Sequence, residues 1–407
     1  MSYIYSIRAH RVALVLVALL ISQAVMGAAL CSAQSSTLLA MSSDLDKRIT
    51  APAAILVEAS TGRVLWEKNA DVGRPIASVV KVMTLILVME ALREGRIELD
   101  DVYITSEHTA SMGGSQIWLE PGEAMAVSEL VKAVAIESAN DAAVALAEHV
   151  AGSEPAFVAL MNERAQVLGC KNTHFINATG LPGSSPAEDC VSSARDVAIM
   201  SRELLKHPQV HEWLTIWIGY VRDGKNMLTN TNRLIRFYPG ADGIKTGYTA
   251  RSKYCLSATA VRNNVRVIGV VLGVPTSATR FAESSTLLDY GFKMCEAHIL
   301  AQAGQEIGSL QVLRGVDTEV NVTVDSDFAV VTLRGEGDAI DARLELPQYV
   351  RAPVERGQRI GKIVAIVDGE EVNSAYLVAA SDVPKASAFS LVVRTAKEFV
   401  RSIFDFR

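Results

Sequence analysis

Changes in the spacing of hydrophobic and polar residues divide this chain into a series of predicted helices and strands. Short apolar runs at 53–58 and 63–67, joined by a Ser-Thr-Gly turn, predict two adjacent strands. The run at 79–92 is predominantly apolar, which predicts a buried helix. Residues 128–149 also have a helical pattern, but the turn-prone Ser-Ala-Asn-Asp at 138–141 divides it into two helices.

The middle of the chain continues with a helix, a pair of strands and a second helix. Residues 193–207 predict a helix that begins at a serine with an aspartate three residues later, a variant of the capping box. Residues 254–260 and 265–272 alternate like antiparallel strands, and 279–292 predict a long helix. Strands at both ends with helices between them indicate an α+β domain with an antiparallel sheet, which we place at residues 51–298.

Beyond residue 298 the pattern changes to short apolar runs separated by Gly and Asp turns. The runs lie at 319–324, 328–333, 342–346, 360–367 and 374–378. Such spacing predicts a separate, small all-β domain over residues 299–383. It contains no cluster of residue types that would suit catalysis, so we expect it to act as a spacer or a docking module.

Composition narrows the range of functions. The 407 residues are 49% hydrophobic, which is enough for a large core and for two or three domains. The formal net charge is −6, and no basic stripe is available for phosphates. A nucleic-acid-binding function is therefore disfavoured.

The beginning of the chain has the layout of a secretory signal peptide. Basic residues precede an apolar run at 12–21, and small residues follow it. The alternative, a retained membrane span, is disfavoured because the run is short. We therefore expect residues 1–33 to be a signal peptide, residues 34–50 to be a polar linker, and the protein to be exported.

The last predicted element, at 384–407, is an amphipathic helix. Its apolar side would consist of Phe389, Val392, Val393, Ala396, Phe399, Val400, Ile403 and Phe404. Charged residues, several of them basic, occupy the other side, which suits a helix lying in the plane of a membrane surface. We expect it to attach the protein to the outer face of the cytoplasmic membrane; the alternative is a helix docked on the protein's own core.

Neither the cysteines nor the histidines predict a metal site. The cysteines after residue 33 are Cys170, Cys190, Cys255 and Cys295. They are too scattered for a disulfide framework, although single disulfides are possible in an exported protein. His207 and His211 are four residues apart, but Pro208 between them interrupts a helix, so we interpret both as surface residues. We predict no metal and no cofactor.

Candidate chemistry centres on Ser78 and Lys81. On a helix, residues three apart lie on one face about one turn from each other. Apolar neighbours surround the lysine, so we expect burial to lower its pKa and to turn it into a base. A serine hydroxyl becomes a good nucleophile when an adjacent base takes its proton. Taken alone, the Ser-x-x-Lys pattern equally suits a solvated helix face.

A second motif, Ser138-Ala139-Asn140, lies at the predicted break between two helices. Ser138 could pass a proton between Lys81 or the nucleophile and a leaving amine. The amide of Asn140 could orient Lys81 and hold a substrate carbonyl. By itself, this tripeptide is better explained as a simple helix break.

The third motif, Lys245-Thr246-Gly247, lies on a predicted edge strand. The lysine would present positive charge and the threonine a hydroxyl to a substrate carboxylate, and the glycine would let the backbone approach a ligand closely. By itself, this motif is better explained as a turn. The occurrence of all three motifs in this order favours a common site.

Together the motifs resemble those of serine penicillin-recognising enzymes. The chain is similar, over nearly all of its mature part, to the low-molecular-mass penicillin-binding proteins, the serine-type D-alanyl-D-alanine carboxypeptidases of peptidase family S11. The resemblance is carried by Glu-Ser-Ala-Asn-Asp-Ala-Ala at 137–143, Ser-Ser-Ala-Arg-Asp at 192–196, Asn-Thr-Asn-Arg-Leu at 230–234, Gly-Ala-Asp-Gly-Ile-Lys-Thr-Gly-Tyr-Thr at 240–249 and Thr-Arg-Phe-Ala-Glu-Ser at 279–284.

This resemblance implies a β-lactamase/transpeptidase-like catalytic domain, followed by the β-rich domain and the terminal helix. It implies that Ser78, with Lys81 as base, attacks the carbonyl between two D-alanines at the end of a peptidoglycan stem peptide. The terminal D-alanine would leave, and water would hydrolyse the acyl-enzyme. β-Lactam antibiotics would acylate the same serine and act as covalent inhibitors.

The resemblance also assigns roles in substrate binding. The backbone N–H groups of Ser78 and Tyr248 would form the oxyanion hole. The substrate carboxylate would be bound by Lys245, Thr246 and Arg280. The peptide itself would add to the edge of the sheet as an extra β-strand.

Two features depart from the family pattern as we expect it. The loop at 181–191 is longer than expected, and Cys190 stands where a histidine or tyrosine is commoner. Tyr248 also replaces another frequent side chain. Neither lies within a motif, but both bear on substrate preference and on the rate of deacylation.

Two other functions stay open. A class A β-lactamase shares the three motifs and deacylates with a glutamate, and Glu188 lies in about that place, although its neighbours do not fit the expected pattern. A membrane-docked scaffold protein with an inactive site is the second. Release of D-alanine from a peptide ending in D-Ala-D-Ala would distinguish the three functions.

Overall fold

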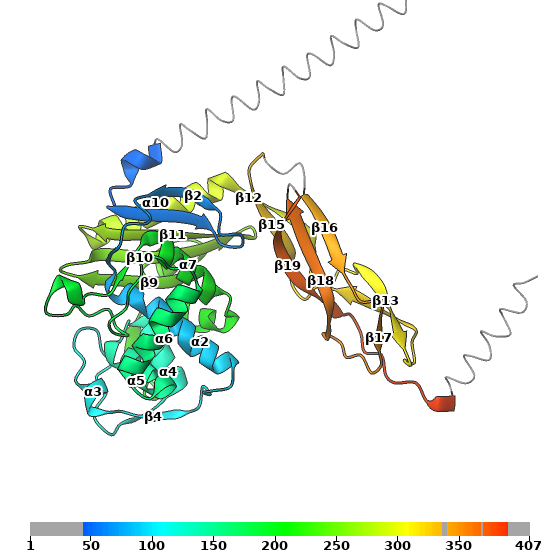
Figure 1. The fold of residues 1–407 in the computed structure, drawn as a ribbon, viewed down its shortest axis with the longest axis horizontal. Helices are drawn as coiled ribbons and strands as arrows, with labels where there is room; N and C mark the ends of the chain where they lie inside the picture. Colours follow the sequence, from blue (N-terminus) through cyan, green and yellow to red (C-terminus); the bar gives the residue numbers. More distant parts are fainter. Residues whose placement is uncertain (1–43, 336–339, 368, 390–407) are drawn as a thin grey trace, which may run out of the picture. The chain divides into compact units, whose positions relative to one another are not determined.

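The computed structural model describes residues 44–335, 340–367 and 369–389 (Figure 1). The predicted signal peptide at 1–33, the first part of the predicted linker and the predicted amphipathic helix from residue 390 onward lie outside these ranges. Residues 44–48, within the predicted linker, form a short helix. Among the described residues, no helix combines the length and the apolar character that spanning a membrane requires.

A five-stranded antiparallel sheet forms the centre of the domain that carries the three motifs, here called the larger domain. Its strands are β1 (Ala53–Glu58), β2 (Val64–Lys68), β9 (Ala241–Thr249), β10 (Lys253–Arg262) and β11 (Val265–Val274). They lie in the order β2-β1-β11-β10-β9, and every neighbouring pair is antiparallel. The prediction of an antiparallel sheet is confirmed, and the third motif lies on the edge strand β9 as expected.

Helices cover both faces of this sheet. They are α2 (Lys81–Arg93), α4 (Val127–Ile136), α5 (Asn140–Ala151), α6 (Glu154–Val167), α7 (Ala194–Leu205) and α10 (Ser277–Met294). On β11, a Cβ added to Gly269 would lie 3.4 Å from Leu287 of α10. Ile268 and Val270, which point the other way along the strand, belong to the main core with residues of α2, α5 and α7. Burial on both faces explains why β11 is apolar without alternation.

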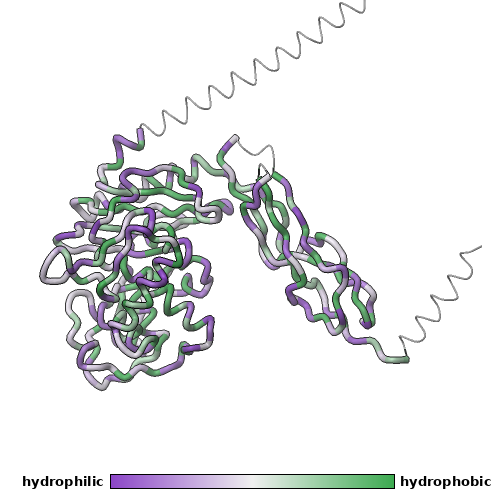
Figure 2. The backbone as a smooth tube through the Cα atoms, viewed as in Figure 1, coloured by the Kyte–Doolittle hydropathy of each residue, from purple (hydrophilic) through white to green (hydrophobic). Residues whose placement is uncertain are grey.

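Short elements complete the larger domain. They are β3 (Arg74–Pro75), η1 (Ala77–Val80), β4 (Val102–Ile104), α3 (Glu107–Ala110), β5 (Ala124–Ala126), η2 (Pro186–Glu188), β6 (Val191–Ser192), η3 (Pro208–Val210), α8 (His211–Leu214), β7 (Ile218–Val221), β8 (Asn226–Thr229) and α9 (Leu234–Phe237). The hydrophobic segments run through the interior of the sheet and the helices (green in Figure 2). Polar segments lie mainly in the loops between them.

Local signals placed the helix boundaries well. The predicted helix at 79–92 is present as α2, preceded by the 3₁₀ turn η1. The predicted division of 128–149 is confirmed, because α4 and α5 are separate helices and Ser138 between them has φ +65°. The side chain of Ser193 caps α7 by accepting a hydrogen bond from the backbone N–H of Asp196 at 3.1 Å.

The C-terminal part of the chain is all-β, as predicted. Its strands are β12 (Cys295–Ala301), β13 (Gly308–Leu313), β14 (Glu319–Thr323), β15 (Phe328–Leu333), β16 (Ile340–Glu345), β17 (Tyr349–Arg351), β18 (Arg359–Val367) and β19 (Glu370–Ala379). Six of them form a sheet in the order β16-β18-β19-β14-β13-β17, and β12 pairs with β15. Three strands were not predicted: β12 runs across residue 298 without a clear alternation, β13 begins with Gly and Ser and has only three apolar residues, and β17 is only three residues long.

Candidate active site

Ser78 lies in the turn η1, between the short strand β3 and helix α2. The residue before it, Ala77, has φ +48°, so the chain bends sharply just ahead of the serine. Gly180 packs against this bend, because a Cβ added to Gly180 would lie only 2.0 Å from the carbonyl oxygen of Ala77 and 2.9 Å from the nitrogen of Ser78. A glycine is therefore required there, and the half-buried Ser78 is supported by a distant loop.

Lys81 begins α2 and is fully buried, as predicted. Its Nζ lies 3.0 Å from Ser78 Oγ, 2.6 Å from Asn140 Oδ1 and 2.8 Å from the carbonyl oxygen of Thr179. Burial lowers the pKa of the Lys81 amine well below its usual value, and the positive charge of Lys245 lowers it further. Both effects favour the neutral form of the Lys81 amine.

In its neutral form, the Lys81 amine can bond all three neighbours only if it accepts a hydrogen bond from Ser78. It has two N–H donors and one lone pair, whereas the Asn140 and Thr179 oxygens can only accept hydrogen bonds. Those two oxygens therefore take the two N–H groups, which leaves the lone pair for the hydroxyl proton of Ser78. The arrangement suits transfer of the Ser78 proton to Lys81.

Asn140 stands at the first turn of α5 and is held from both ends. Its Nδ2 donates to the carbonyl oxygen of Gly113 at 2.6 Å, and its backbone N–H donates to that of Ser115 at 2.7 Å. The amide oxygen is thereby directed to Lys81, as the sequence predicted. Ser138, also buried, lies two residues earlier in the turn between α4 and α5.

Lys245 is the second fully buried lysine of the site. It lies on β9, with Nζ 3.2 Å from the carbonyl oxygen of Thr246. Burial lowers the pKa of the Lys245 amine to about 7, and the nearby charge of Arg280 contributes. Thr246 donates its hydroxyl hydrogen bond to Thr231 Oγ1 at 2.8 Å. Near neutral pH, Lys245 therefore exists as a mixture of charged and neutral forms.

Gly247 joins the edge strand to the Ser78 turn. A Cβ at this position would lie 2.6 Å from the carbonyl oxygen of Ile76 and 3.2 Å from the nitrogen of Ser78. From the sequence, we expected this glycine to let the strand approach a ligand closely. In the structure, the absence of a side chain lets the strand approach the backbone of Ile76 and Ser78. Because of this approach, the second lysine and the serine belong to one site.

Arg280 and Tyr248 flank β9. Arg280, on α10, lies 3.3 Å from the Gly247 carbonyl oxygen, and its guanidinium carbon lies 5.4 Å from the centre of the Tyr254 ring. Burial lowers the pKa of Arg280 to about 10, so it stays charged at neutral pH. Tyr248 is 54% exposed, and its ring centre lies 4.3 Å from that of Tyr254. Arg280 therefore reaches the strand that carries Lys245, and its contact with a substrate carboxylate stays a prediction.

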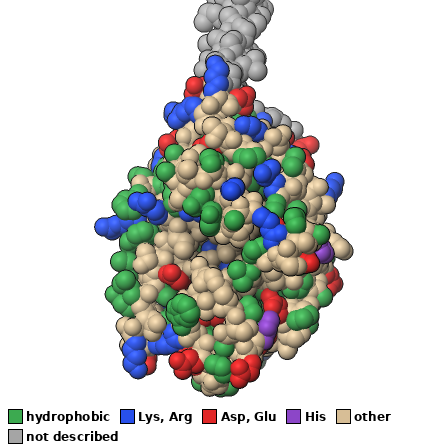
Figure 3. All heavy atoms as spheres, turned by 90° about the vertical axis from the view of Figure 1, so that its left-hand side faces the viewer, with side chains coloured by type: hydrophobic (Ala, Val, Ile, Leu, Met, Phe, Trp, Pro, Cys, Tyr) green, Lys and Arg blue, Asp and Glu red, His purple; other side chains and the backbone are tan. Residues whose placement is uncertain are grey.

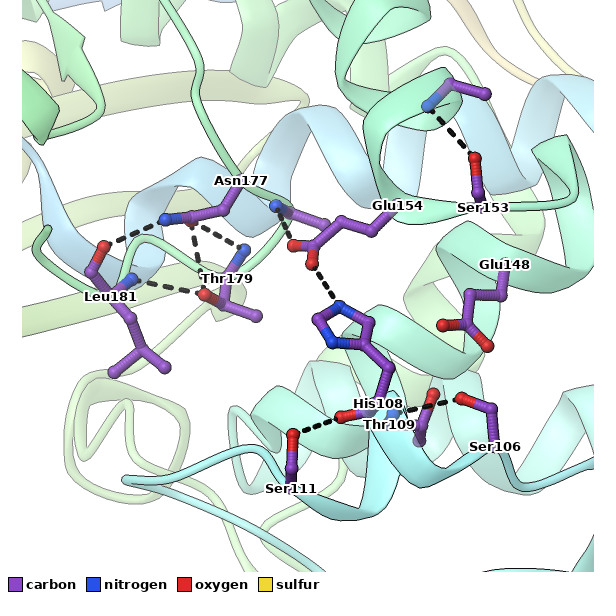
Figure 4. Close-up of polar contacts among 12 residues, drawn as sticks. Ser106, His108, Thr109, Ser111, Glu148, Ser153, Glu154, Asn177, Thr179 and Leu181 are labelled. Atoms are coloured by element: carbon purple, nitrogen blue, oxygen red, sulfur yellow. Dashed lines mark hydrogen bonds and ion pairs between the residues drawn. The ribbon is translucent and has the colours of Figure 1, made fainter.

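The Thr179 carbonyl was not predicted as part of the site. Asn177 orders its loop: the Asn177 side-chain oxygen accepts from Gly180 N at 2.7 Å, and its amide nitrogen donates to the Leu181 carbonyl at 2.9 Å (Figure 4). The carboxylate of Glu154 accepts a further hydrogen bond from the backbone N–H of Ala178 at 2.9 Å. The signal in the sequence is the Asn-x-Thr-Gly run, which is typical of an Asx turn.

The two loop residues singled out in the sequence lie apart from this chemistry. Glu188 is exposed, and its carboxylate accepts hydrogen bonds at 2.7 Å from the backbone and the hydroxyl of Ser184. Cys190 is buried, its sulfur accepts from Ile176 N at 3.3 Å, and burial raises the pKa of its thiol. Both serve the loop's own structure. Among the described residues, Cys170, Cys190, Cys255 and Cys295 form no disulfide.

The interpretation of His207 and His211 as surface residues is wrong. His207 is only 7% exposed, because α7 packs along α2 and carries the histidine inward, and His211 lies partly buried with its Nδ1 3.6 Å from Asp242. Potential ligand atoms of Glu90, Glu203 and His207 lie within 4.8 Å of one another. A positively charged side chain already forms ion pairs with the carboxylates of Glu90 and Glu203.

That cation is Arg164. Its Nη2 lies 2.6 Å from Glu90 and 2.7 Å from Glu203. Lys206 adds a second positive charge, 2.8 Å from Glu203. The two carboxylates are therefore neutralised by protein groups, and we interpret the cluster as a structural ion-pair network.

Figure 3 shows one face of the molecule, which has a depression near its centre with basic atoms at the bottom. Lys81, Lys245 and Asn140 are each at least 97% buried, whereas Ser78 keeps partial exposure. Ser78, Lys81 and Asn140 thus lie together beside Gly247, and the roles of the predicted site residues stay predictions.

Two family models match this chain. A family model described as D-alanyl-D-alanine carboxypeptidase matches residues 40–276, and one described as penicillin-binding protein 5, C-terminal domain, matches residues 296–385. The chain is 42% identical to the D-alanyl-D-alanine carboxypeptidase DacF of Bacillus subtilis, over 86% of this chain and 90% of that protein. It is 33% identical to DacA of Escherichia coli K12, over 85% of this chain and 87% of that protein.

Solved structures give the same result. Penicillin-binding protein 5 of Haemophilus influenzae has a TM-score of 0.61 and 34% identity, covering 83% of this chain and 98% of that chain. Penicillin-binding protein D2 of Listeria monocytogenes, in an ampicillin-bound form, has a TM-score of 0.55 and 33% identity, covering 60% of this chain and 98% of that one.

Proposed function

The chain belongs to the D-alanyl-D-alanine carboxypeptidases, a family of serine hydrolases that act on the cell wall, and from this premise we propose the following roles for its residues. Ser78 is the nucleophile that attacks the carbonyl between the last two D-alanines of a peptidoglycan stem peptide. The carboxypeptidase reaction releases the terminal D-alanine. β-Lactams acylate the same serine because they mimic this dipeptide.

Acylation begins with transfer of the Ser78 proton to the Lys81 amine. As the Ser78–carbonyl bond forms, the negative charge on the carbonyl oxygen is stabilised by the backbone N–H groups of Ser78 and Tyr248. The proton then passes, with Ser138 as relay, to the nitrogen of the departing D-alanine, and the peptide bond breaks. Water attacks the resulting ester, with Lys81 again accepting a proton, and restores Ser78.

The edge strand β9 binds the carboxylate of the substrate. Lys245 supplies positive charge and Thr246 a hydroxyl group, while Arg280 adds a second charge behind Gly247. The substrate lies as an extra strand along the free edge of β9, with Asn140 holding the carbonyl of its acyl part. Gly247 keeps this strand close to Ser78.

One observation carries this proposal: the Lys81 amine is fully buried and bonded to two pure acceptors, with Ser78 Oγ 3.0 Å away in the remaining position. The Ser78→Ala variant tests it. We expect this variant to lose both D-alanine release and labelling by fluorescent penicillin. Mass spectrometry after benzylpenicillin treatment, with peptide mapping, should place the adduct of the native enzyme on Ser78. Labelling that persists in Ser78→Ala would contradict the proposal.

A β-lactamase is the alternative that the motifs leave open. Glu188 lies exposed and bonded to Ser184, which disfavours it as a deacylating base. The comparison of D-alanine release with benzylpenicillin hydrolysis separates the two functions. We expect rapid release of D-alanine and a long-lived penicilloyl adduct, and Glu188→Gln should change neither.

The location of the enzyme is a second part of the proposal. Residues 1–33 direct export, and the helix predicted at 384–407 binds the outer face of the cytoplasmic membrane, while the β-rich domain at 299–383 spaces it from the catalytic domain at 51–298. The sequence pattern of the helix supports this. A chain ending at residue 383 should lose sedimentation with phosphatidylglycerol vesicles and keep D-alanine release. Equal sedimentation of both chains would refute the anchor.

A further inference from the structure

Trp118 is an exposed aromatic residue held on a structured loop between α3 and β5. Its side chain is 71% exposed, whereas its neighbours Ile117 and Leu119 are 2% and 4% exposed. The chain therefore turns its two aliphatic residues inward and the indole outward. Trp118 also has φ +59°, a conformation that residues with bulky side chains rarely adopt. The indole adds little packing to the core.

Buried and partly buried charges fix the backbone of Trp118 from two sides. Asp141, fully buried at the start of α5, accepts hydrogen bonds from Ile117 N at 3.1 Å and Leu119 N at 3.0 Å. From the other side, Arg222 donates to the carbonyl oxygens of Ile117 at 2.7 Å and Trp118 at 3.1 Å. An exposed side chain on such a fixed backbone is pre-organised to bind a partner.

The same loop forms part of the active site. Its residues Gly113 and Ser115 bond Asn140, and a Cβ added to Gly114 would lie 2.8 Å from the Asn140 amide nitrogen. Asp141, which fixes the Trp118 segment, directly follows Asn140 in the chain. Asp141 therefore links the Trp118 segment to Asn140, the residue proposed to hold the acyl part of the substrate.

We propose that Trp118 is a specificity-determining residue that binds the side chain of the substrate residue preceding D-Ala-D-Ala. This inference depends on the proposed function, in which the peptide lies along β9 and its acyl part passes Asn140. An indole ring offers a broad apolar surface, so it favours a long aliphatic side chain. A terminal amine on that chain adds attraction to the face of the ring. The side chain selected is therefore of the lysine type.

Two peptides test this selectivity: Nα-acetyl-L-Lys-D-Ala-D-Ala, and the same peptide with glycine in place of lysine. For Trp118→Ala, we expect KM for the lysine peptide to rise about tenfold with kcat nearly unchanged, the size of effect that loss of a few buried methylenes produces. Both constants for the glycine peptide should stay within about twofold. Trp118→Phe should retain most of the preference for lysine.

Two controls separate this role from a structural one. Tyr349→Ala removes an exposed aromatic residue from strand β17 of the C-terminal domain and should leave both peptides unaffected. Trp118→Gly accommodates the positive φ better, so it should unfold at the same temperature as the native protein or higher, while losing the preference for lysine.

Three results would overturn the inference. These are equal losses for both peptides in Trp118→Ala, an unchanged KM for the lysine peptide, and a native enzyme without preference for lysine over glycine. Failure of the proposed function would differ from each of these, because the native enzyme would then release D-alanine from neither peptide.

Discussion

The active site contains two buried lysines, and their surroundings differ in a way that separates their roles. Lys81 lies at the start of a helix, with three oxygen atoms within 3.0 Å of its amine. Lys245 lies on an edge strand, and its amine has the Thr246 carbonyl oxygen at 3.2 Å. Both lose solvation, but only Lys81 has its N–H groups and its lone pair directed to specific neighbours. This difference supports the roles proposed for them, with Lys81 as the base and Lys245 as the group that binds a charged ligand.

The strongest test of this difference removes the base. Lys81→Ala should lower the rate of acylation by benzylpenicillin by about 10³-fold, because general-base catalysis contributes between 10² and 10⁴. Stopped-flow measurement with a fluorescent penicillin gives this rate directly. Asn140 would lose its partner in the variant, so thermal unfolding must confirm that the fold is intact. A variant that acylates at the native rate would remove Lys81 from the mechanism.

Removal of the second lysine should have a smaller effect of another kind. Lys245→Met should reduce kcat/KM for D-Ala-D-Ala peptides by about 10²-fold, mainly through KM, because a desolvated carboxylate loses its partner charge. Lys245→Arg keeps the charge and serves as the matched control. If Lys245→Met lowers kcat and leaves KM unchanged, Lys245 does not act as a carboxylate-binding group.

The connection between the two lysines can be tested at Gly247. In Gly247→Ala the new Cβ would lie 2.6 Å from the Ile76 carbonyl oxygen, so β9 has to move away from Ser78. We expect kcat/KM to fall about 30-fold, in keeping with the cost of small displacements at a reacting centre. Gly308→Ala is the control, since the nearest atom to its new Cβ lies at an ordinary 3.8 Å. Equal activity of both variants would argue against a tight junction.

The dependence of activity on pH should show both lysines with opposite signs. Lys81 must be neutral, so kcat/KM should fall at low pH. Lys245 must be charged, so kcat/KM for the peptide should also fall as pH rises above about 7, the pKa of its amine. This upper limb should move to higher pH in Lys245→Arg. A limb that stays in place in that variant would have another origin.

The last test concerns stability. The Lys245 pKa is about 7 in the folded protein and 10.5 in an unfolded chain, so the unfolded state binds more protons between these values. Stability contributed by this group therefore rises with pH across that window, by at most about 1.4 kcal/mol per pH unit. Urea unfolding at pH 7 and pH 9.5 should show a smaller rise for Lys245→Met. Equal rises would mean that Lys245 is not buried in solution.

Elements with a strong local pattern were predicted well. Ser78 and Lys81 meet because three residues on a helical turn are always close, and this needs no knowledge of the rest of the fold. The division between α4 and α5 follows from small, turn-prone residues in one place. Strands of the C-terminal domain with an apolar alternation were also found. Those without it, such as β12 and β17, were missed because pairing rather than sequence defines them.

The parts of the site that were missed depend on distant segments. The Thr179 carbonyl reaches Lys81 only because Gly180 packs against the Ala77 bend, just over one hundred residues away in the chain. His207 is buried because α7 lies along α2, which no local pattern reports.

The sequence by itself predicted the contact between Ser78 and Lys81, the strand that carries the third motif and the order of the two domains, since each depends mainly on neighbours in the chain. Only the tertiary structure decided which oxygen atoms surround the Lys81 amine, which backbone segment packs against Gly247, and that the side chain of Trp118 is exposed. Those outcomes depend on hydrogen bonds and close contacts between segments far apart in sequence, and such contacts exist only once the chain has packed.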